Sequence, residues 1–129
     1  MENVILFKEL ADNWYEGHLK IGDQKIIISG SCEKNPILHL QSAYRFFVQG
    51  GIRAQCVFNH SSACYLIVLR RQEDMVKVEV IKLDERFENN AKLKNHQYLD
   101  ANIVFSASTP LDYFANAIFA KENHTNELH

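Results

Sequence analysis

The alternation of short strand-like runs around a single capped helix constrains this fold more than any other feature of the sequence. Five runs rich in β-branched or alternating apolar residues precede residue 84, at residues 14–21, 25–29, 52–58, 63–70 and 75–83. Gly22 and Asp23 form a turn between the first two runs. Short polar links join the last three runs, which is typical of an antiparallel meander.

One of these strands is expected to lie in the centre of the sheet. Residues 63–70 are almost continuously apolar, whereas the neighbouring runs at 52–58 and 75–83 alternate between apolar and polar residues. A continuous apolar run indicates burial on both faces, so we expect residues 63–70 to be covered on each side.

The helix between the second and third runs has clear boundaries. Asn35 is a favourable N-cap, and Pro36 suits the first helical position. Apolar residues then recur at helical spacing, at Ile37, Leu40, Tyr44, Phe47 and Val48. Gly50 and Gly51 end the helix, because glycine accepts the left-handed conformation at a helix C-terminus.

Two more elements are predicted near the C-terminus. Residues 101–107 resemble a strand. Thr109 and Pro110 then repeat the pattern of a polar cap followed by proline, and Asp112 falls in the first turn, where the helix dipole favours an acid. Before these elements, residues 84–100 are polar and without sustained periodicity, which suits a functional surface or a solvated connection equally well.

Together these elements predict one α+β domain over residues 1–129, a mostly antiparallel sheet of about six strands with two helices packed on it. Residues 3–11 fit a strand or a short helix and are not counted among the six. The polar tail at 121–129 is expected to be disordered.

Composition excludes some classes of partner. The chain has 14 Lys and Arg residues against 16 Asp and Glu residues, which gives a net charge of −2 and no basic half. Binding to nucleic-acid backbones is therefore not expected. The N-terminus lacks the features of a signal peptide, and the longest apolar run, residues 63–69, is far too short to span a bilayer. We expect a cytoplasmic protein with no membrane contact.

The cysteines and histidines do not form a recognisable site. Three cysteines without a signal peptide argue against a disulfide framework, and no C-x-x-C occurs. Cys56 and Cys64 flank a predicted turn that contains His60, and the two thiols could lie near each other; a hairpin does not readily aim all three side chains at one point. Cys32 lies in a polar loop and is expected to be the accessible thiol.

No catalytic, cofactor-binding or metal-binding residue is therefore predicted, and we do not expect an enzyme. The sequence contains no phosphate-binding glycine loop and no nucleophile elbow. Basic and acidic residues are interleaved in the segment Arg70–Glu79. Cross-strand charge pairing accounts for these basic residues as well as binding of a ligand would.

Residues 14–83 carry a pattern of strands, cap and helix that resembles small bacterial immunity proteins. The residues that carry it are Trp14-x-x-Gly17-x-Leu19-x-Ile21, Ile26-x-Ile28-x-x-Ser31, Pro36-x-x-x-Leu40-x-x-Ala43, Gly50-Gly51 and Tyr65-x-Ile67-x-Leu69-Arg70-Arg71-x-x-Asp74-x-Val76-x-Val78-x-Val80. Such proteins are encoded beside contact-dependent growth inhibition toxins and other polymorphic toxins. The resemblance implies a sheet with one or two helices, and a function of binding a cognate toxin domain to block its active site or its access to substrate.

Mild acidity suits an inhibitor of a basic nuclease toxin, because carboxylates imitate phosphates and speed association. The expected toxin-binding residues are acids and aromatic anchors of the turn at 73–74 and of the long polar segment: Glu73, Asp74, Asp84, Glu85, Phe87, Glu88, Tyr98 and Asp100. Two alternatives stay open, a small-ligand-binding or enzymatic α+β domain and a subunit-interaction module. Oligomeric state is not predicted.

Overall fold

Seven strands and two helices make up the described part of the chain, which in this computed structural model comprises residues 3–60, 63–83, 103–120 and 123. The strands are β1 (Val4–Ala11), β2 (Trp14–Ile21), β3 (Gln24–Ser31), β4 (Arg53–Asn59), β5 (Cys64–Gln72), β6 (Met75–Leu83) and β7 (Ile103–Pro110). The helices are α1 (Pro36–Val48) and α3 (Leu111–Ile118). The α+β class is confirmed, with seven strands where the sequence predicts about six; the additional strand is β1, from the ambiguous segment 3–11.

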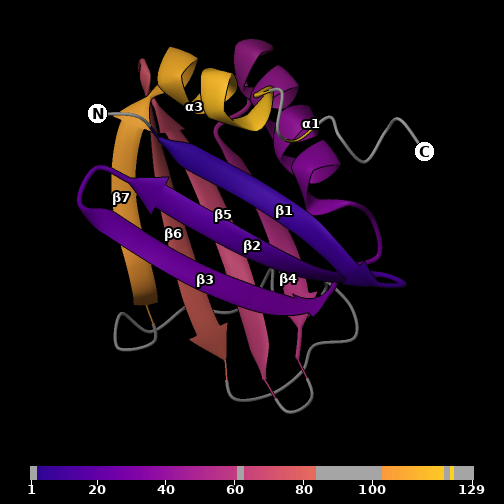
Figure 1. The fold of residues 1–129 in the computed structure, drawn as a ribbon. Helices are drawn as coiled ribbons and strands as arrows, with labels where there is room; N and C mark the ends of the chain where they lie inside the picture. The colour runs from indigo at the N-terminus through magenta and orange to yellow at the C-terminus, as the bar shows by residue number, and fades with distance from the viewer. Residues whose placement is uncertain (1–2, 61–62, 84–102, 121–122, 124–129) are drawn as a thin grey trace.

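The strands follow their order in the sequence across one antiparallel sheet, β1 to β7. This sheet is bent into two layers, because β3 and β4 are joined at a single residue pair, Ser31 and Asn59. Figure 1 shows β1, β2 and β3 crossing steeply over β4 to β7, with both helices at one end of the two layers. Helix α3 thus lies beside β1 and near the ends of β6 and β7, and α1 lies beside β4, β1 and α3.

The main core fills the space between the two layers. Phe7 of β1 stacks on Phe58 of β4 with ring centroids 5.6 Å apart, and both residues belong to the main buried cluster. From β5, Ile67 and Leu69 enter this core, whereas Leu66 and Val68 form a second buried cluster with Ile81. The prediction that residues 63–70 are buried on both faces is therefore confirmed.

Helix α1 begins and ends where the sequence predicts. The side-chain oxygen of Asn35 accepts a hydrogen bond from the Ile37 N–H at 3.0 Å, and Pro36 is the first helical residue. Gly50 has a φ of 104° just after the helix, as the predicted glycine C-terminus requires. Val48, assigned by periodicity to the apolar face, is instead 58% exposed, while its neighbour Phe47 fills the buried side of the same last turn.

Helix α3 begins one residue later than the sequence predicts. Pro110 still belongs to β7, where it lies opposite Met75, and the helix begins at Leu111. Thr109 does not cap the helix; its hydroxyl oxygen accepts a hydrogen bond from the Asn3 side chain. The strand extends through the Thr-Pro pair because Leu111 donates its N–H to the Asp74 carbonyl, 2.7 Å away across the neighbouring hairpin.

Asn123 falls in the predicted tail and is buried. Its side-chain nitrogen donates to the Ile5 carbonyl at 2.8 Å and to the Ala117 carbonyl at 3.1 Å, which joins this residue to β1 and to α3. Neither helix of the described residues is long and apolar enough to cross a membrane.

Candidate functional site

The turn between β5 and β6 lies at the helix-bearing end of the sheet and carries Glu73 and Asp74. Gln72 and Met75 pair across it, so the two acids are its only loop residues. Both side chains are exposed, and Glu73 adopts a φ of 56°, a left-handed conformation that is unfavourable for a residue with a Cβ atom. The structure thus presents two adjacent carboxylates at a tight, strained turn.

Arg71 anchors this turn to the C-terminus of α1. Its guanidinium donates to the Phe47 carbonyl of the helix and, through Nε, to the Glu73 carbonyl at 2.8 Å. Its backbone N–H donates to the Ile52 carbonyl at 2.9 Å. A cation at the negative end of a helix dipole is favourable. Arg71 therefore holds α1, the turn and the start of β4 side by side.

Exposed apolar residues gather around the two acids. Asp74 also accepts the first N–H of α3, which brings Asp112 and the 51% exposed Tyr113 to the same end of the molecule. We define the helix-end surface by its exposed acids and apolar side chains: Phe46, Val48, Ile52, Glu73, Asp74, Met75, Asp112 and Tyr113. Five of the nine large hydrophobic residues that are exposed in the described part of the chain belong to it. Such clustering is typical of an interaction surface.

Two of the expected toxin-binding residues, Glu73 and Asp74, therefore lie on one surface. The other six lie outside the described residues: Asp84, Glu85, Phe87, Glu88, Tyr98 and Asp100. Sequence reasoning missed the contribution of the helices. The sequence does contain an indication of Phe46, because this large aromatic residue falls outside the apolar stripe of α1 and is therefore expected to be exposed. Tyr113 is off the stripe of its helix in the same way.

Two basic side chains of β5 and β6, Arg70 and Lys77, form ion pairs with one buried acid. Glu79 is only 6% exposed, and it accepts from Arg70 at 3.2 Å and lies 3.8 Å from the Lys77 ammonium. Cross-strand charge pairing is thereby confirmed for this part of β5 and β6. The exposed acids of the helix-end surface are Glu73, Asp74 and Asp112, and the cations Arg45, Arg53 and Arg71 lie beside them in the chain or at the same end of α1.

A second group of reactive side chains lies at the other end of α1. The sulfur atoms of Cys32 and Cys56 are 3.8 Å apart, and a ring nitrogen of His39 lies within 4.8 Å of both. Cys32 is 5% exposed, so the prediction that it is the accessible thiol is wrong. The polar loop is folded inward there, since the Cys32 N–H donates to the Asn13 carbonyl of the β1–β2 turn.

The partner of Cys56 also differs from the expected one. Cys64 lies opposite Asn59 in the β4–β5 ladder, and Cys56 lies opposite Ile67, so these two cysteines do not face each other. The hydrogen bond with Cys56 and the backbone N–H groups of Lys34 and Glu33 lower the pKa of the Cys32 thiol. That same sulfur–sulfur contact and burial raise the pKa of Cys56, and burial lowers the pKa of His39.

Comparisons with known proteins find a similar fold but no matching family. No protein-family model and no curated protein sequence matches this chain. Among solved structures, the fold is similar to a chain of the "CdiA-CT/CdiI toxin and immunity complex from Enterobacter cloacae". The TM-score is 0.50 and the sequence identity 12%, over 92% of this chain and 91% of that chain. At this identity the likeness is one of fold, spread over nearly the whole length of both chains.

Proposed function

We propose that this protein is an immunity protein that binds a cognate bacterial toxin domain and blocks its active site, acting by binding and without catalysis. The observation that carries the proposal is the likeness in fold to a chain of a toxin and immunity complex, over 92% of this chain. The resemblance of residues 14–83 to bacterial immunity proteins points the same way from the sequence. The partner is then a protein, the C-terminal toxin domain of a neighbouring gene product.

The helix-end surface supports this proposal and suggests where the toxin docks. Exposed aromatic residues such as Phe46 and Tyr113 have the size and rigidity of anchors in protein interfaces. The carboxylates of Glu73, Asp74 and Asp112 would attract the basic substrate-binding face of a nuclease, because they carry the charge that its natural substrate presents. A nuclease is accordingly the toxin class we propose.

Co-expression with the C-terminal domain encoded immediately upstream tests the proposal. We expect cells to survive that domain only when this chain is present, and the two proteins to be purified together. This chain expressed alone should leave growth unchanged. A neighbouring domain that is harmless by itself, or that kills equally well in both cases without forming a complex, contradicts the proposal.

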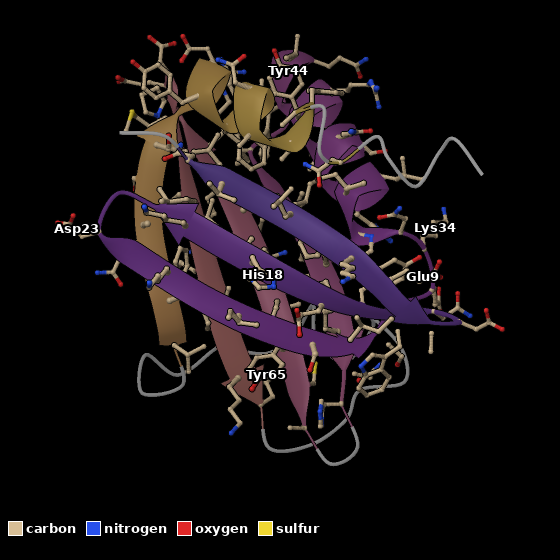
Figure 2. All side chains as sticks on the ribbon, viewed as in Figure 1. Glu9, His18, Asp23, Lys34, Tyr44 and Tyr65 are labelled. Atoms are coloured by element: carbon tan, nitrogen blue, oxygen red, sulfur yellow. The ribbon has the colours of Figure 1, made fainter. Side chains whose placement is uncertain are left out.

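Charge reversal locates the surface. The double variant Glu73→Lys, Asp74→Lys should lower the association rate with the toxin by about 10-fold or more, since like charges then meet at first encounter. The matched control is Asp12→Lys, Asp23→Lys, which reverses exposed acids on two other hairpin turns. Figure 2 shows Asp23 on the β2–β3 turn, which lies apart from the two helices.

Equal association rates for the two double variants would remove the helix-end surface from the toxin interface. Such a result would leave the immunity function itself to be judged by survival and co-purification, so the location of the interface and the function are tested separately.

A further inference from the structure

The thiols of Cys32 and Cys56 and the imidazole of His39 form a group that the toxin-binding proposal does not use. They come from three different parts of the fold: Cys32 follows β3, His39 is the fourth residue of α1, and Cys56 lies inside β4. Lys34, labelled in Figure 2, marks the loop between Cys32 and the helix. The helix-end surface begins at the opposite end of α1, with Phe46. The two sites are therefore separate.

We propose that Cys32, His39 and Cys56 bind a zinc ion. Two cysteine sulfurs and one histidine nitrogen are ligands that Zn²⁺ commonly selects in proteins, and the fourth position is left for a water molecule. Binding releases one proton from each of the two thiols, and His39 binds as the neutral imidazole. The charge of the two thiolates then balances that of the metal.

The distances fit a tetrahedral zinc ion. Two thiolates, each about 2.3 Å from the metal and separated by the tetrahedral angle, lie about 3.8 Å apart. The sulfur atoms of Cys32 and Cys56 are 3.8 Å apart before any movement. A disulfide would require the same atoms to approach to about 2.05 Å, so the present separation matches a shared metal ion and not a disulfide.

His39 needs only a small adjustment. A zinc-bound sulfur and a zinc-bound nitrogen lie about 3.6 Å apart, and the ring nitrogen of His39 is already within 4.8 Å of both sulfurs. His39 is half-buried, so rotation of its side chain about its rotatable bonds supplies the remaining distance. Its exposed side gives the metal a route from solvent.

Hydrogen-bond donors of the backbone face the Cys32 sulfur. The N–H groups of Lys34 and Glu33 bond to it, and hydrogen bonds of this kind stabilise coordinated thiolates in metal sites. A pair of thiols that merely fills the core would not require a histidine facing it. The metal would join β3, α1 and β4 at the point where the two layers of the sheet are otherwise linked by one residue pair.

Metal titration tests the proposal on the intact protein. The chain is reduced, freed of metal with a chelator, and titrated with Co²⁺ and then Zn²⁺ under reducing conditions. We expect one equivalent of Co²⁺ to produce thiolate-to-cobalt charge-transfer absorption, which Zn²⁺ then abolishes. We also expect saturating Zn²⁺ to raise Tm by about 5 °C or more.

Variants establish which residues bind the metal. His39→Ala and Cys56→Ala should each weaken zinc binding by at least about 10-fold. The matched controls, His18→Ala and Cys64→Ala, remove a histidine and a buried cysteine outside the group and should bind zinc like the unmodified protein. Because His39 is half-buried, its variant should fold even where replacing Cys56 leaves too large a cavity.

Three outcomes would overturn the proposal. One is the absence of charge-transfer absorption in the reduced protein. Another is equal zinc affinity of His39→Ala and His18→Ala. A third is oxidation of Cys32 and Cys56 to a disulfide, seen as a loss of two mass units, in a protein that binds no zinc when reduced.

Discussion

Glu73 combines an unfavourable backbone conformation with a place on the helix-end surface. Its φ of 56° costs a residue with a Cβ atom about 1 kcal/mol, a cost that glycine avoids. We expect Glu73→Gly to increase the free energy of unfolding by up to about 1 kcal/mol while slowing association with the toxin, because one carboxylate is lost. Urea denaturation and stopped-flow association measure the two effects.

Asn13 provides the control for this prediction. It has a φ of 60° on the β1–β2 turn, and asparagine tolerates this conformation better than glutamate does. Asn13→Gly should therefore stabilise the protein by a smaller amount and leave the association rate unchanged. If Glu73→Gly is stabilising but associates with the toxin at the unmodified rate, the Glu73 carboxylate does not contribute to toxin binding.

Individual residues also show where sequence reasoning stops. The N-cap of Asn35 could be predicted because the bond it accepts from Ile37 is local. The burial of Cys32 could not, because it depends on the loop meeting Cys56, 24 positions further along the chain. A polar neighbourhood in the sequence indicates exposure only when tertiary contacts do not fold the segment inward.

At the scale of elements, the backbones of β3 and β4 approach each other closely at the junction between the two layers. A Cβ atom on Gly30 would lie 2.9 Å from the carbonyl oxygen of Asn59, which is backbone and does not yield easily. We expect Gly30→Ala to lower the free energy of unfolding by about 1–3 kcal/mol, measured by urea denaturation, because β3 must separate from β4 to admit the methyl group.

Gly51→Ala is the matched control. Its Cβ atom would meet the Phe46 ring at 2.2 Å, an even shorter distance, but that ring belongs to a half-exposed side chain that can rotate away. The expected loss is therefore below about 0.5 kcal/mol. Equal losses for the two variants would show that the β3–β4 junction adjusts as readily as a surface side chain.

The elements themselves were largely predictable, since most follow from local patterns. Six strands and both helices are found near the expected positions. The exceptions depend on distant partners: residues 4–11 are a strand because they pair with β2, and β7 extends to Pro110 because it pairs with Met75. A single segment contains neither of these pairings. Its periodicity alone therefore left the first segment open between strand and helix, and ended the second strand at residue 107, three residues early.

For the molecule as a whole, the sequence predicts a sheet with two helices but not the crossing of its layers (Figure 1). That crossing follows from one residue pair between β3 and β4. The fold places the helix ends beside the β5–β6 turn. It therefore brings the acids Glu73 and Asp74, which were predicted from the sequence as toxin-binding residues, to the same end as Phe46 and Tyr113, which were not. The candidate surface is thus a product of the tertiary fold, because α1, the β5–β6 turn and α3 contribute to it from separate parts of the chain.

A surface of this kind predicts how the complex responds to salt. With a net charge of −2 on the whole chain and three exposed acids on the helix-end surface, association with a basic toxin should slow by about 10-fold as ionic strength rises from roughly 0.03 to 0.3 M. The dissociation rate should change little, because desolvated contacts are weakly screened. Stopped-flow mixing measures the first rate and competition with unlabelled protein the second. An association rate independent of salt would mean that the apolar residues of the surface act without electrostatic attraction.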